Sequence, residues 1–191
     1  MVGCPSSIGA IDGVVAPVAE YREFGGTVGL GTDQAPGPGH HDPLREARTA
    51  ALLSKTDRAD PTALPAWAAL RTATVGGAEA LGIDDRVGSL AEGKAADVVT
   101  VDVTALGVAP TVTEPLHTAV TNLVHSAVGR DVLDVFVAGR PVVRAGEFVD
   151  ADPAAAVAEA RERAAGVFDR ATEDWRAAGS ALVDAVDQGW L

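Results

Sequence analysis

The sequence predicts an α/β protein, and three features of its 191 residues indicate this class. An apolar helical stripe at 17–24 leads through a glycine pair into an apolar strand at 27–32, which is the αβ unit typical of parallel sheets. After Gly82, short β-type runs separated by turns replace the helical pattern. From 153 to 175 the chain is rich in Ala, Glu and Arg, at the spacing of an exposed amphipathic helix.

These changes of pattern divide the chain into three predicted parts. Residues 1–82 carry the αβ unit and further helices, 83–150 carry the β-type runs, and 151–191 form a helical tail. The pattern leaves open whether the tail helix continues beyond Trp175 to Val186.

Helix signals are clearest in the first part. Pro17 suits a first helical turn, where its missing N–H costs little, and Gly25-Gly26 ends that helix. Asp42 is a good N-cap and Pro43 a good first residue for a second helix, which is predicted to run to about Lys55.

A third helix is predicted over 64–81, with Gly82 as its stop, and strands are predicted after it. Gly139-Arg140 is interpreted as a hairpin turn. The predicted strands of this part are 87–90, 96–102, 123–127, 132–137 and 141–143.

Composition excludes several classes of function. The net charge is −12 and no cluster of Lys or Arg is present, which argues against nucleic-acid binding. The single cysteine, Cys4, allows no internal disulfide and favours a reducing compartment. The uncharged runs are too short and too rich in glycine for a membrane span, and the start lacks a secretory signal. We therefore expect a cytoplasmic protein without a membrane partner.

Asp33 is the first candidate functional residue. It stands where the apolar strand ends, directly before a glycine- and proline-rich loop at 34–39. An acid at the end of a barrel strand can bind a metal or move a proton at the mouth of a pocket. The same residue could instead cap the next turn or helix, and the pattern alone favours neither reading.

Four stretches together resemble the metal-dependent amidohydrolases, in the branch of cytosine deaminase, S-adenosylhomocysteine deaminase and chlorohydrolases. Residues 4–7 with 14–18 are similar to the seventh barrel strand and the start of its helix, and 28–33 to the eighth strand. Residues 73–98 are similar to the exit from the barrel into a β-sandwich, and 135–143 to the closing hairpin of that sandwich.

This resemblance implies a specific fold and site. The chain would hold the last two βα units of an incomplete TIM-type (β/α)8 barrel, part of a small β-sandwich and a C-terminal helix. The family binds a divalent metal, zinc or iron, through a His-x-His pair, a further His and the aspartate of the eighth strand. Only Asp33 corresponds to such a ligand here, and the resemblance makes it both a metal ligand and a proton shuttle.

The remaining ligands have no counterpart in this sequence. His40 and His41 are adjacent, and adjacent residues of a strand face opposite ways, so they do not form a His-x-His pair. Together with Ser7 they are candidates for substrate contact at the barrel mouth; the alternative is that the histidines are solvated loop residues and Ser7 a wall or turn residue. We do not expect this chain alone to hold the metal.

The sequence therefore predicts a fragment of a metal-dependent amidohydrolase that hydrolyses C–N bonds, with a small nitrogen heterocycle as substrate. Alone it is expected to be inactive. A second hypothesis is a non-catalytic interaction subunit that pairs with a separate barrel portion or with itself. A third is that the start is misassigned and that the missing ligands are encoded upstream of Met1.

Overall fold

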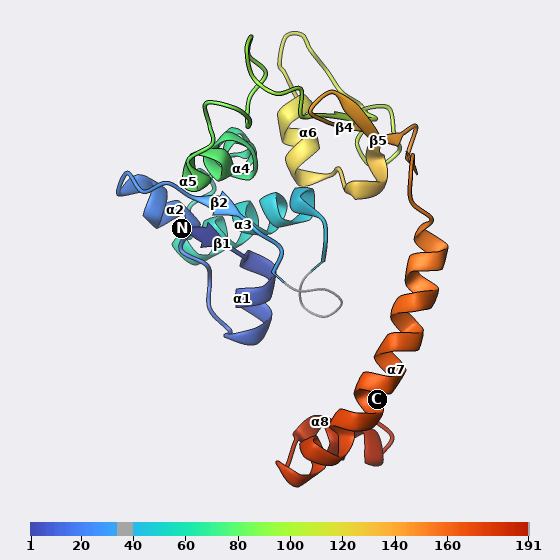
Figure 1. Cartoon of the computed structure of the whole chain (residues 1–191). Coiled ribbons are helices and arrows are strands. Elements are labelled where there is room, and N and C mark those ends of the chain that lie inside the picture. The colour runs from blue at the N-terminus through green and yellow to red at the C-terminus, as the bar shows by residue number, and fades with distance from the viewer. Residues whose placement is uncertain (34–39, 191) are drawn as a thin grey trace. The chain divides into compact units, whose positions relative to one another are not determined.

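The computed structural model describes residues 1–33 and 40–190 and forms two compact units, Met1–Val149 and Asp150–Leu191 (Figure 1). The first unit combines helices with a parallel and an antiparallel sheet, which confirms the predicted α/β class. Among the helices that the structure describes, none has the length and apolar character needed to cross a bilayer.

The predicted parallel arrangement is present in a short form. Strand β1 (Val2–Gly3) pairs in parallel with β2 (Gly29–Leu30). The second strand is thus shorter than the predicted 27–32. The segment 4–7, which resembles the seventh barrel strand, instead enters helix α1 (Pro5–Ile11). Pro5 explains this difference, because proline at the first helical position is set up for a helix.

Between the two strands, helix α2 (Val18–Glu23) begins after Pro17, close to the prediction. Helix α3 (Pro43–Arg58) follows β2, and the Asp42 carboxylate caps it by accepting hydrogen bonds from the Leu44 and Arg45 amides. The predicted cap is therefore confirmed. The other oxygen of Asp42 accepts the Gly129 amide at 2.9 Å, which ties the start of α3 to the segment just before strand β4 (Val132–Val137).

The predicted helix at 64–81 is two helices, α4 (Ala66–Ala73) and α5 (Val75–Leu81), separated by a non-helical Thr74. Gly82 ends α5 in the left-handed conformation, as predicted. Helix α5 approaches strand β2 closely because it carries Gly76 and Gly77 on the side that faces the strand. A Cβ on Gly76 would lie 2.6 Å from the Val28 carbonyl oxygen, and a Cβ on Gly29 would lie 2.9 Å from the Gly77 Cα.

The predicted strand at 123–127 is wrong. These residues fall mostly in helix α6 (Ala119–His125), and Val120 and Val124 pack against the core one turn apart. The Asn122 side chain holds the helix by donating to the Val108 and Pro110 carbonyl oxygens. A short apolar run fits a buried strand and a buried helix equally well, so packing decides between them.

The core of this unit lies where α3, α4 and α6 pack on one another, with β2 against α3 and α4. Small apolar side chains dominate it, which allows these helices to approach closely. Its buried members are Ala16, Val18, Ala19, Val28, Ala47, Ala50, Ala51, Leu64, Ala69 and Val124.

An antiparallel sheet follows, in the order β3-β4-β5-β6. Its hairpin turn is Ala138-Gly139, both at positive φ, one residue before the predicted position. The predicted strand at 87–90 is absent, because Gly88 bends the chain against α5 with a φ of +87°. The strands are β3 (Val98–Val101), β4 (Val132–Val137), β5 (Arg140–Arg144) and β6 (Glu147–Phe148), with the 3-10 turn η1 (Gly129–Asp131) before β4.

The second unit contains helix α7 (Pro153–Ala177) and helix α8 (Ala181–Asp187). Asp152 caps α7, and the Phe168 and Trp175 rings pack edge to face on it. Gly179, with a φ of +69°, interrupts the helical path, so the tail helix ends before Val186 and a second helix begins.

The two glycines of α5 give a matched test of the close approach to β2. Gly76→Ala should lower the free energy of unfolding by about 1–3 kcal/mol, because the new methyl group meets backbone on two sides. Gly77→Ala should leave it unchanged or raise it by up to about 1 kcal/mol, since its methyl group would meet only the Thr72 carbonyl oxygen, at 3.9 Å. Urea unfolding of both variants checks this; equal effects would contradict it.

Candidate functional site

The structure brings Asp33 and Ser7 together at one edge of the parallel sheet. Asp33 follows β2, and Ser7 lies in α1, which follows β1. The Ser7 hydroxyl donates to an Asp33 carboxylate oxygen at 2.6 Å. Ser7 is only 2% exposed whereas Asp33 is exposed, so the serine holds the carboxylate from the protein side and leaves it open to solvent.

The backbone at Asp33 is unusual. Its φ of +58° is in the left-handed region, which is uncommon for any residue other than glycine. Asparagine and aspartate tolerate this conformation better than most residues. In this conformation the Asp33 carboxylate lies within hydrogen-bond distance of the Ser7 hydroxyl.

Cys4 lies beside this pair, between β1 and α1. Burial raises the pKa of the Cys4 thiol, and the negative charges of Asp33 and Glu46 raise it further. The thiol is therefore protonated at neutral pH and is a poor nucleophile. This chemistry suits a wall residue.

Glu46 is the member of the site that the sequence prediction missed. It lies in α3 and is 0% exposed, the largest fully buried side chain of the described residues. One carboxylate oxygen accepts the Ser6 amide at 3.1 Å. A signal was present in the sequence, because Glu46 occupies the same helical stripe as Ala50 and Ser54, where an acid is out of place.

His40 and His41 have different surroundings. His40 is half-buried, and its Nε2 lies 3.5 Å from a carboxylate oxygen of Glu46. His41 is exposed and does not join this group. Of the two histidines predicted to contact substrate, the structure therefore brings only His40 to the site, and the substrate contact itself stays a prediction.

A catalytic zinc is held by about three protein ligands. In 1–33 and 40–190, no group of three or more His, Cys, Asp and Glu side chains could hold a metal ion. The described part of the chain therefore does not fit a catalytic metal by itself, and Asp33 offers a single carboxylate.

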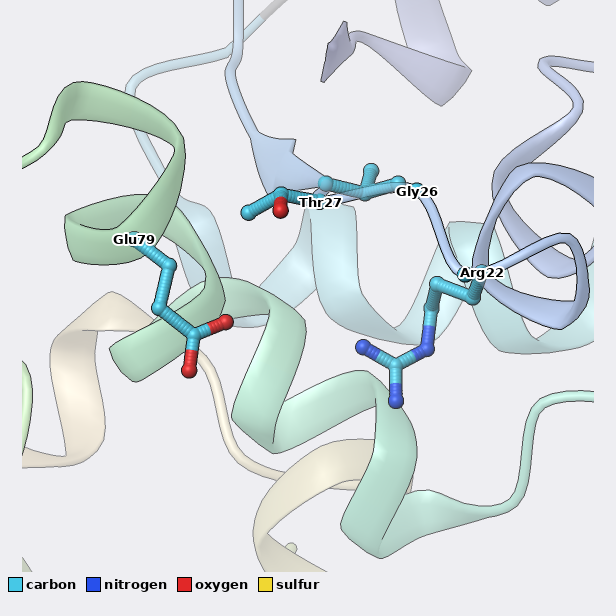
Figure 2. Close-up of a pocket in the computed structure, with 6 residues that line it drawn as sticks. Arg22, Gly26, Thr27 and Glu79 are labelled. Carbon is cyan, nitrogen blue, oxygen red and sulfur yellow. The ribbon is translucent and has the colours of Figure 1, made fainter.

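A pocket lies at the other end of β2. It is lined by Arg22, Gly25, Gly26, Thr27, Val28 and Glu79. Figure 2 shows the Arg22 and Glu79 side chains on either side of Thr27. Arg22 already donates to the Thr72 hydroxyl at 3.2 Å. The pocket adjoins residues 25–28, which precede β2, whereas Asp33 follows β2, so the pocket is not part of the Asp33 site.

Comparison with known proteins gives a consistent result. Residues 1–142 match the model of the amidohydrolase family. The chain is 39% identical over 167 residues to a 5-methylthioadenosine/S-adenosylhomocysteine deaminase of Pelotomaculum thermopropionicum, a match that covers 87% of this chain and 37% of the relative.

Solved structures agree with this match. An adenosine deaminase of Xanthomonas campestris with bound zinc is 40% identical, with a TM-score of 0.77 over 84% of this chain and 36% of the deaminase. An atrazine chlorohydrolase of Arthrobacter aurescens complexed with zinc is 30% identical, with a TM-score of 0.67 over 83% of this chain and 34% of that protein. The chain thus spans about a third of the length of these relatives.

The surroundings of Cys4 give a test of the site geometry. Asp33→Asn should lower the pKa of the thiol, because it removes a nearby negative charge, and should speed alkylation by iodoacetamide at a fixed pH near 8. Asp57→Asn removes the same charge from an exposed position on α3 and should leave the rate unchanged. An equal rate for Asp33→Asn and the unaltered chain would place the carboxylate away from Cys4.

Proposed function

This chain belongs to the amidohydrolase family, and on that premise we propose that it is part of a metal-dependent hydrolase that cleaves C–N bonds, with ring deamination as its reaction. The observation that carries the proposal is the Ser7–Asp33 pair at the edge where β1 and β2 end. In barrel enzymes of parallel strands, the active site lies at this end of the strands.

We further propose that the first unit supplies the last two βα units of a TIM-type barrel together with part of a β-sandwich. The parallel pairing of β1 with β2 and the helices around them support the barrel units. The antiparallel sheet β3-β4-β5-β6 supports the sandwich portion. The earlier strands of the barrel would come from outside this chain, in line with the third of the relatives' length that it spans.

In the complete enzyme we assign two roles to Asp33. It is one ligand of a divalent metal, zinc or iron, whose other ligands lie outside this chain. It is also the carboxylate that accepts a proton and returns it to the leaving nitrogen. The Ser7 hydroxyl orients it for both roles, since its 2.6 Å hydrogen bond fixes one oxygen and leaves the other available.

The proposed substrate is a small nitrogen heterocycle, in line with the nucleoside deaminases among the relatives. His40 is the better-placed contact, because it is half-buried and its Nε2 lies 3.5 Å from the buried Glu46 carboxylate, whereas His41 is exposed. His41 is retained as a solvent-side contact only. Alone, the chain is proposed to be inactive, since a single carboxylate does not hold a catalytic zinc.

One observation favours a second candidate function. The parallel sheet has only two described strands, so both β1 and β2 present an edge without a strand partner in the described residues. Open edges invite pairing with another chain. The chain would then be an interaction subunit that pairs with a separate barrel portion or with itself, and Asp33 would complete a site in trans.

Activity by complementation tests the first proposal. The purified chain with zinc should not deaminate adenosine, 5-methylthioadenosine or S-adenosylhomocysteine. Co-expression with the barrel portion of the Pelotomaculum relative that this chain does not cover should produce turnover. Asp33→Asn should then lower the rate about 100-fold or more, and Asp57→Asn should leave it unchanged. Turnover by the chain alone, with stoichiometric zinc, would refute its proposed inactivity.

Light scattering after size exclusion tests the second candidate. An interaction subunit should form a dimer, or a stable complex with the same barrel portion, because its strand edges are open. A monomer that stays separate from the barrel portion would count against this function. Asp33→Asn should not alter the assembly, which separates the interaction from the chemistry.

A further inference from the structure

Burial of Glu46 needs an explanation that α3 itself does not provide. The helix is already capped by Asp42, and its buried stripe is otherwise made of alanine and serine. Removing a carboxylate from water is costly unless it is paired or hydrogen-bonded. One oxygen accepts the Ser6 amide, and the other lies 3.5 Å from His40 Nε2 without a hydrogen bond in the described structure. Neither neighbour belongs to α3.

The Ser6 contact replaces a missing cap. Helix α1 starts at Pro5, and in the described structure its N-cap residue Cys4 makes no side-chain capping hydrogen bond. The first amides of a helix have no acceptor within the helix. Glu46 accepts one of them from a neighbouring helix, at 3.1 Å. The Ser6 hydroxyl also donates to Thr49, at 3.4 Å, so α3 holds this residue at two points.

The next residue connects this anchor to the candidate site. Ser7 follows Ser6 in the first turn of α1 and donates to Asp33 at 2.6 Å. A hydrogen bond of this length tolerates little displacement. The position of the Ser7 hydroxyl therefore depends on where α1 begins, and Glu46 fixes that point.

We propose that Glu46 is a positioning residue for Asp33: by holding the start of α1 against α3, its buried carboxylate places the Ser7 hydroxyl on the Asp33 carboxylate. The other oxygen of the same carboxylate lies 3.5 Å from His40 Nε2, without a hydrogen bond in the described structure, so the proposal concerns the Ser7–Asp33 pair. That this arrangement serves deamination rests on the proposed function, whereas the positioning itself does not.

Carbon-13 NMR of the chain alone tests the positioning without any turnover. The probe is the side-chain carboxylate resonance of Asp33 at fixed pH, and Ser7→Ala defines the shift caused by loss of its donor. Glu46→Leu should shift the resonance in the same direction, and adding Ser7→Ala to it should cause little further change. Glu46→Gln should keep the unaltered position, because its amide oxygen can still accept the Ser6 amide.

Glu79→Gln, at an exposed site on α5, is the matched control and should not move the resonance. A folded Glu46→Leu variant with an unmoved Asp33 resonance would overturn the proposal, as would a Glu46→Gln shift as large as that of Glu46→Leu. If Glu46→Leu does not fold, amide hydrogen exchange decides. The Ser6 amide should be protected in the unaltered chain and in Glu46→Gln, and rapid exchange in the unaltered chain would overturn the proposal.

Discussion

The parallel pairing of β1 with β2 is the constraint on which the candidate site depends. Parallel strands end at the same edge of a sheet, so the segments that leave them start side by side. One of these segments carries Ser7 and the other carries Asp33, and a single hydrogen bond joins them. The close contact of Gly29 with α5 keeps this short sheet on the helices, and hence keeps both segments in place.

Around that sheet, polar groups are arranged by helices that come later in the chain. Glu46 of helix α3 is fully buried and accepts the Ser6 amide at the start of α1. The exposed Asp33 carboxylate is therefore linked, through Ser7 and Ser6 of α1, to the buried carboxylate of Glu46. A single hydrogen bond, from the Ser6 amide, satisfies this carboxylate, and its other oxygen lies near His40 without a hydrogen bond in the described structure.

Structural features set by one or two neighbouring residues could be predicted from the sequence. Features that depend on packing between distant segments could not. The cap at Asp42 and the stop at Gly82 are properties of single residues, and both were confirmed. The strand predicted at 123–127 is wrong because a short apolar run fits a strand and a helix equally well. Packing of Val120 and Val124 against residues distant in sequence makes it part of helix α6. Asp33 was found by its place at a strand end. The helical stripe that Glu46 shares with Ala50 and Ser54 indicates its burial, but its contact with Ser6 depends on α1, which the sequence did not predict.

Asp42 has a mechanical consequence for the chain. Its two oxygens serve different parts: one caps α3, and the other accepts the Gly129 amide ahead of the antiparallel sheet. One side chain therefore joins the start of the helix that bears Glu46 to the segment before the antiparallel sheet, and loss of Asp42 would remove both contacts at once.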